Sequence, residues 1–131
     1  MKFLSFTHNG LSSFGVIDNQ DILDLGAVNP DLIDLRDAIK KDRLNELAKQ
    51  AQKLEPSFSI NEIEFLPTIP NPEKIICIGV NYADRNAEYK DGSKPPKYPS
   101  VFMRTRESLV GHQQNIMDPP ESDQLDYEGE I

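Results

Sequence analysis

Three carboxylates, Asp126, Glu128 and Glu130, occupy alternate positions in the segment 125–131. If this segment is a strand, as its bounding apolar residues and Tyr127 indicate, all three side chains project from one face. Carboxylates two residues apart on a strand lie about 7 Å apart, near enough for both to bind one hard cation. Three like charges on one face repel one another, and a divalent ion would offset that repulsion. The spacing therefore indicates a metal site with oxygen ligands.

A second group of polar residues follows the apolar run 74–80. This run is rich in β-branched residues and predicts a strand buried on both faces, with the single cysteine, Cys77, as a buried thiol. A buried strand with polar groups at its end is a common support for reactive side chains. Tyr82 and Glu88, in the polar segment 81–89, are candidates for such roles, although ordinary helix-surface positions carry the same residue types.

Residues 90–99 contain three lysines and three prolines and predict a long loop. It is either a lid that attracts an anionic substrate or an ordinary solvated loop. Residues 100–104 predict another strand, with Arg104 at its end. His112 falls in a presumed turn, without the spacing to a second histidine that a metal site needs, and is expected to be non-catalytic.

The first 70 residues predict a small α+β unit. Turn signals at 9–10 and 18–19 separate segments of alternating polarity, which predicts three short antiparallel strands over 2–6, 13–17 and 22–25. Two amphipathic helices follow. Asn29 and Pro30 predict the start of the first, and Asp42 predicts the cap of the second. Their apolar stripes are expected to pack on the preceding sheet, with a partner-binding groove as the alternative.

Prolines at 56, 67, 70 and 72 interrupt regular structure around one short predicted strand, 63–66. They predict a domain boundary, with a small N-terminal α+β domain over 1–70 and a second, incomplete domain over 71–131.

Composition excludes several classes of function. The 131 residues carry a formal net charge of −8, which argues against sequence-independent binding to nucleic acid or to an anionic membrane. No run approaches the ~18 apolar residues of a membrane span, and the N-terminus lacks a signal-peptide pattern. A reducing, cytoplasmic location is therefore expected.

Four segments together resemble the fumarylacetoacetate hydrolase family, which includes acylpyruvate hydrolases, oxaloacetate decarboxylases and the isomerase/decarboxylase of homoprotocatechuate breakdown, an aromatic catabolic route. Each segment is weak alone, but all occur in the family's order and spacing: 74–82, 98–104, 108–111 and 125–131. The resemblance implies that residues from 71 onwards begin a mixed β-roll that continues past residue 131 in the family.

The resemblance also implies a metal site and an enzymatic activity. Glu128 and Glu130 match a Glu-x-Glu pair that binds Mg²⁺ or Mn²⁺, whereas Asp126 does not match a ligand. The family's third ligand, an Asp further along, is absent from this chain. Such a site would act on 2-oxo or 2-hydroxy-dienoic acids, by acylpyruvate-type C–C hydrolysis, decarboxylation or keto–enol isomerisation.

A departure from the family pattern bears on which reaction is implied. Glu88 aligns with the Glu of a His-Glu dyad that activates water, but Arg85 occupies the histidine position. Arginine stays protonated and cannot act as a general base, which favours isomerisation or decarboxylation over hydrolysis. Glu88 and Arg85 are thus the implied catalytic residues, and Tyr82 and Arg104 the substrate-binding residues. Either Arg104 or Arg85 is the candidate partner of the substrate's second carboxylate.

Two further expectations accompany this hypothesis. The full-length protein is expected to be a homodimer with a small 2-oxo acid as substrate, while the 131-residue chain alone is expected to be inactive. The alternative is a non-catalytic interaction module or subunit fragment without bound metal.

Overall fold

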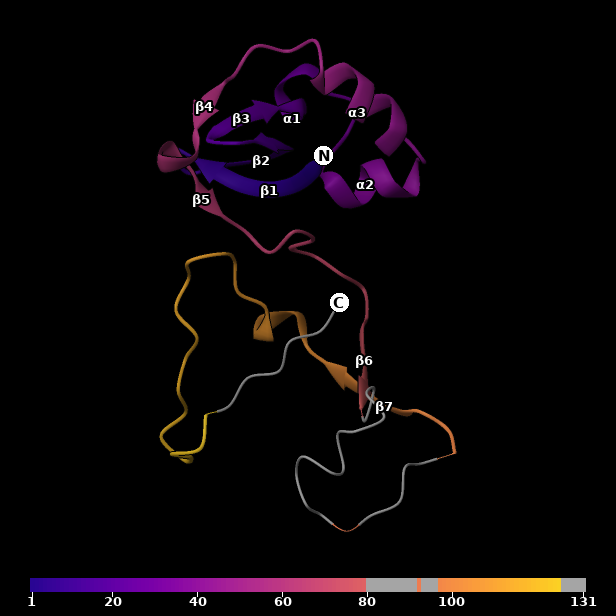
Figure 1. The fold of residues 1–131 in the computed structure, drawn as a ribbon, viewed down its shortest axis with the longest axis vertical. Coiled ribbons are helices and arrows are strands. Elements are labelled where there is room, and N and C mark those ends of the chain that lie inside the picture. Colours follow the sequence, from indigo (N-terminus) through magenta and orange to yellow (C-terminus); the bar gives the residue numbers. More distant parts are fainter. Residues whose placement is uncertain (80–91, 93–96, 126–131) are drawn as a thin grey trace.

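The computed structural model describes residues 1–79, 92 and 97–125, which form two antiparallel sheets with short helices (Figure 1). The larger sheet has five strands in the order β4-β3-β2-β1-β5, and the smaller sheet pairs β6 with β7. The combination of antiparallel sheets with separate helices confirms the predicted α+β fold class. The β-roll and the domain boundary near residue 70 stay predictions. None of the helices in the described part of the chain is long and apolar enough to cross a membrane.

The three predicted N-terminal strands are confirmed. The larger sheet consists of β1 (Lys2–His8), β2 (Leu11–Asp18), β3 (Asp21–Asp24), β4 (Phe58–Ser59) and β5 (Glu64–Phe65). Asn9 and Gly10 join β1 to β2 with φ angles of 50° and 77°, the left-handed pair that a tight two-residue hairpin needs. The second turn lies at Asn19 and Gln20, one residue later than predicted.

The helices begin elsewhere than the sequence predicted. They are α1 (Leu25–Val28), α2 (Leu35–Lys40) and α3 (Leu44–Ala51). The predicted helix start at Asn29 is wrong, because the Asn29 side chain donates a hydrogen bond to the Leu25 carbonyl at 2.8 Å and closes the end of α1. Asp34 caps α2 instead, accepting a hydrogen bond from the Asp37 amide at 2.7 Å.

The predicted cap of α3 at Asp42 is also wrong. Asp42 has a φ of 55°, which belongs to a tight connection rather than to the extended backbone of a capping residue. Arg43 occupies the position before α3 and pairs with Asp31 and Glu46. The hydrogen bond from Arg43 holds the pKa of the Glu46 carboxyl below its usual value.

Replacing Asp34 with Ala is expected to lower the free energy of unfolding by about 1 kcal/mol, because the Asp37 amide at the start of α2 loses its acceptor. The matched control is Asp31→Ala, which removes an exposed ion pair with Arg43 and should change stability by less than about 0.5 kcal/mol. Urea unfolding followed by circular dichroism measures both. Equal shifts in the two variants would contradict the capping role.

The hydrophobic core lies between the larger sheet and its helices. Phe14 and Val16 of β2 and Leu23 of β3 belong to one buried cluster with the helix residues Leu25, Leu35, Ala38, Leu47 and Ala51. The predicted packing of the helical stripes on the preceding sheet is confirmed. Leu35, Ala38, Leu47 and Ala51 of these stripes are at most 2% exposed, which argues against the alternative, a partner-binding groove, whereas Ile39 of the predicted stripe is 49% exposed.

Candidate active-site strand pair

The strands β6 (Ile75–Gly79) and β7 (Ser100–Arg104) form an antiparallel pair at the positions that the sequence predicted. Directly opposed residues share a face of an antiparallel pair, so the register separates the side chains into two sets. One face carries Ile75, Cys77 and Gly79 opposite Arg104, Phe102 and Ser100. The other face is entirely apolar and carries Ile76, Ile78, Val101 and Met103. Charge and polar groups therefore gather on a single face of the pair.

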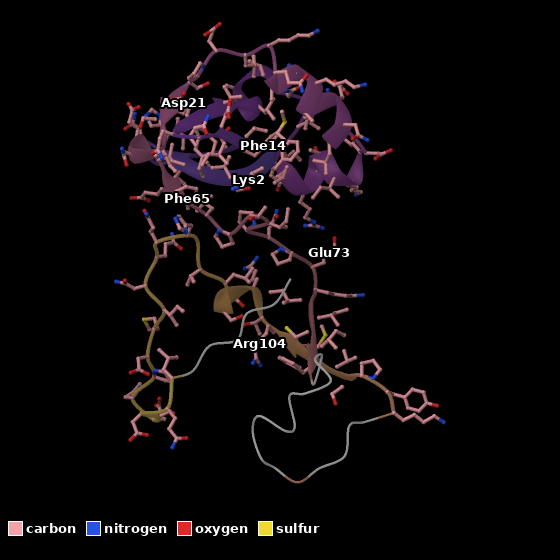
Figure 2. The ribbon with its side chains drawn as sticks, in the orientation of Figure 1. Lys2, Phe14, Asp21, Phe65, Glu73 and Arg104 are labelled. Atoms are coloured by element: carbon pink, nitrogen blue, oxygen red, sulfur yellow. The ribbon has the colours of Figure 1, made fainter. Side chains whose placement is uncertain are left out.

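Arg104 lies at the end of β7, as predicted (Figure 2). Its side chain stacks on a neighbour of the same strand. Its guanidinium carbon is 4.7 Å from the centre of the Phe102 ring, a cation–π arrangement. Residues two apart on a strand share a face, so this contact follows directly from the register. The planar, permanently charged guanidinium suits a carboxylate or a phosphate.

Gly79 keeps the space beside the Phe102 ring open. A Cβ atom built on Gly79 would lie 3.8 Å from two ring carbons of Phe102 and 3.3 Å from the Cβ of Ser100. The last of these is a tight contact, so a larger residue at 79 would press on β7. A glycine here lets the two strands approach each other closely beside the ring that supports Arg104.

The strand pair is more exposed than the sequence predicted. Burial of β6 on both faces is wrong, because Ile76 is 58% exposed and Ile78 39% exposed. Cys77 is half-buried rather than fully buried. In the described part of the chain β6 pairs with β7 alone, and a two-stranded pair has too few neighbours to cover its own apolar side chains.

Most of the predicted site residues lie outside the described residues. Tyr82, Arg85 and Glu88 belong to the segment 80–91, and Glu128 and Glu130, with Asp126, belong to 126–131. Arg104 is thus the one predicted site residue whose position the structure gives. The support that Phe102 provides was missed by sequence reasoning, although the spacing of two residues on a predicted strand was the available signal.

The predicted metal ligands, Glu128 and Glu130, stay a prediction. Among the residues that the structure describes, no group of three or more His, Cys, Asp or Glu side chains could hold a metal ion. Glu128 and Glu130 offer oxygen donors only, and this donor set suits Mg²⁺ or Mn²⁺ better than softer ions.

Comparison with known proteins identifies the second half of the chain. Residues 74–131 match the family model described as "Fumarylacetoacetate (FAA) hydrolase C-terminal". A mitochondrial oxaloacetate tautomerase of Bos taurus is 37% identical over 76 residues, covering 58% of this chain and 24% of the relative. The corresponding protein of Xenopus laevis is 36% identical over 120 residues, covering 87% of this chain and 36% of the relative.

An uncharacterized protein of Staphylococcus aureus is 31% identical over 152 aligned positions, covering 100% of this chain and 50% of the relative. The chain thus spans half or less of the length of these relatives. An α+β fold with a charged strand pair defines only a broad class of proteins. The segment 74–131 narrows the possible classes, since it matches the model of the fumarylacetoacetate hydrolase family, as the sequence predicted.

Proposed function

We propose that this chain contributes to a metal-dependent enzyme that moves a proton in small 2-oxo acids, converting keto and enol forms. The observation that carries the proposal is the match of residues 74–131 to the family model, together with relatives named oxaloacetate tautomerases. The names of these relatives favour isomerisation among the three reactions that the sequence left open. The 2-hydroxy-dienoic acids are a second substrate class for the same chemistry.

The residue types of the predicted site support proton transfer better than hydrolysis. Hydrolysis needs an activated water, and Arg85 cannot act as the base that would activate it. Tautomerisation needs one group that takes a proton from carbon, and Glu88 is the proposed proton shuttle. The proposed metal ligands are Glu128 and Glu130, and a bound Mg²⁺ or Mn²⁺ supplies electrostatic stabilisation of the negative charge that develops on the substrate oxygen.

Arg104 is the proposed partner for a substrate carboxylate, with Tyr82 as a further substrate-binding residue. The guanidinium carbon of Arg104 lies 4.7 Å from the centre of the Phe102 ring, and this stacking limits the orientations of the guanidinium. Oxaloacetate carries two carboxylates, so one can bind with the keto oxygen near the metal and the other can meet an arginine. A homodimer is the proposed assembly of the full-length protein.

The test is a substitution of Arg104 in a protein that carries this chain together with the rest of the family domain. Arg104→Met should raise the KM for oxaloacetate at least about tenfold, because a charge-assisted hydrogen bond contributes roughly 1.5–3 kcal/mol. The KM for a 2-oxo acid with one carboxylate should change little. Keto–enol conversion followed by ultraviolet absorbance measures both.

Two results would count against the proposal. Equal losses for the two substrates would exclude Arg104 as the partner of the second carboxylate. Unchanged turnover in the Glu88→Gln variant would exclude the proton shuttle. The 131-residue chain alone is expected to show no turnover, since two carboxylates without a third ligand bind Mg²⁺ weakly.

A second candidate function is a non-catalytic interaction module. The exposed apolar face of the strand pair favours it, since Val101 is 60% and Met103 57% exposed. The two candidates differ in their metal dependence. A chain that binds a partner equally well with and without Mg²⁺, and has no turnover within any longer protein, would support the module.

A further inference from the structure

The connection after β5 is attached to the larger sheet by backbone and side-chain hydrogen bonds. The amide of Leu66 donates to the Ser5 carbonyl at 3.0 Å, and the Ser5 hydroxyl donates to the Thr68 carbonyl at 2.8 Å. Ser5 is 3% exposed, so these bonds form at a buried position of β1. The proline-rich connection therefore leaves the sheet along a defined path.

A second set of bonds holds the end of this connection to α2. Arg36 donates from Nη1 to the Asn71 carbonyl at 3.0 Å and forms an ion pair with Glu73. Asn71 donates from Nδ2 to Oδ2 of Asp34 at 2.8 Å, the carboxylate that also caps α2. We name this set the Arg36 clasp. It lies immediately before β6, which begins at Ile75.

The chain returns to the larger sheet after β7. Gly111 is buried, and a Cβ atom built on it would lie 2.1 Å from the carbonyl oxygen of Phe65 in β5. Any side chain at 111 would collide with this backbone, so the close approach requires glycine. The His112 ring meets the Phe65 ring edge-on, with centres 5.0 Å apart and planes at 87°. Figure 1 shows the segment after β7 rising towards β5.

The returning segment is a defined turn. The Gly111 amide donates to Oε1 of Gln114 at 2.6 Å, and the Gln114 amide donates to the Gly111 carbonyl at 3.1 Å. Gln113, between them, has a φ of 64°. Because these hydrogen bonds are made within the turn, the turn can pack against β5 through its shape and through the contact between the His112 and Phe65 rings. A 360 Å³ groove lined by His112, Gln113 and Gln114 and by residues 63–65 lies at this junction.

We propose that the exposed side of β5 is a docking surface for the turn 111–114, and that this dock and the Arg36 clasp together fix the strand pair β6–β7 to the larger sheet. The occupant of the surface is a segment of the same chain. One attachment precedes β6 and the other follows β7, so the strand pair is anchored on both sides. The orientation of Arg104, which lies opposite the first residue of β6, is set by the N-terminal unit.

Residual dipolar couplings of the 131-residue chain test this inference without any turnover. Amides of β1–β3 and amides of β6–β7 should fit a single alignment tensor in the wild type. In Gly111→Ala the two groups should need separate tensors, with a smaller magnitude for β6–β7, because the added methyl pushes the turn away from Phe65. Two tensors in the wild type, or one tensor in Gly111→Ala, would overturn the inference.

Three further variants serve as controls for this reading of the residual dipolar couplings. Val110→Ala is the matched control, since Val110 is 45% exposed and next to the dock, and it should keep the single tensor. His112→Ala should loosen the strand pair less than Gly111→Ala, and His112→Phe should keep it attached, because an aromatic edge still meets Phe65. If Gly111→Ala also lost the cross-strand contacts of β6 and β7, the comparison of His112→Ala with His112→Phe would decide. Equal alignment tensors for the β6–β7 amides in these two variants would overturn the proposed docking of the turn 111–114 on β5.

Discussion

Replacing Phe14 with Ala is expected to lower the free energy of unfolding of the N-terminal sheet and helices by about 3–5 kcal/mol. The Phe14 ring is 1% exposed and lies in the core cluster between β2 and the helices. Its loss removes apolar burial and leaves a cavity that the surrounding side chains fill only in part. Small units are stable by only about 5–15 kcal/mol, so the variant should be near the limit of folding.

Urea unfolding followed by far-ultraviolet circular dichroism measures this change. The matched control is Leu11→Ala on the same strand, since Leu11 is 76% exposed and its truncation should shift stability by less than about 0.5 kcal/mol. A Phe14→Ala midpoint equal to that of the control would show that the helices do not depend on this face of the sheet.

Replacing Glu130 with Gln is the second large effect that we expect. In a protein with the whole family domain, the affinity for Mn²⁺ should fall by more than about 100-fold, because loss of a supporting residue alone typically costs 10–100-fold and a ligand contributes more. Glutamine keeps the size and removes the charge that a hard cation needs. Titration calorimetry with MnCl₂ at fixed pH measures the affinity directly.

The control for this prediction is Asp126→Asn, on the same predicted strand face. Asp126 does not match a ligand of the family, so its replacement should weaken Mn²⁺ binding only slightly. Equal losses in the two variants would mean that the row of carboxylates acts as a diffuse negative charge. In that case Glu128 and Glu130 would not be specific ligands.

Local patterns predicted the parts of the structure that local forces decide. Asn9 and Gly10 tolerate the left-handed backbone of a tight hairpin, so their neighbours were predicted as strands correctly. The predicted helix starts were wrong where the expected capping residue makes a different hydrogen bond or adopts a different backbone conformation. Asn29 bonds to Leu25 and Gln50, and Asp42 adopts a positive φ, because tertiary packing fixes the path between the helices.

Burial of the strand pair shows the same limit. The apolar run that became β6 correctly predicted a strand, because β-branched residues favour extended backbone. Its burial depends on what covers each face, and one neighbouring strand cannot supply that cover. The place of Arg104 at a strand end and its face shared with Phe102 were both predictable from sequence, whereas the residues of β6 that lie opposite them needed the register of the two strands.

The β1–β2 and β2–β3 hairpins and the resemblance to the family follow from residue types at short spacings, since strand periodicity and turn chemistry act over a few residues. The carboxylate row stays a prediction. The attachment of the strand pair needed the tertiary structure. Phe65 and Gly111, and likewise Arg36 and Glu73, lie tens of residues apart, and no local pattern encodes that they meet. Such contacts form only in the folded chain, where the connection before β6 reaches α2 and the segment after β7 reaches β5.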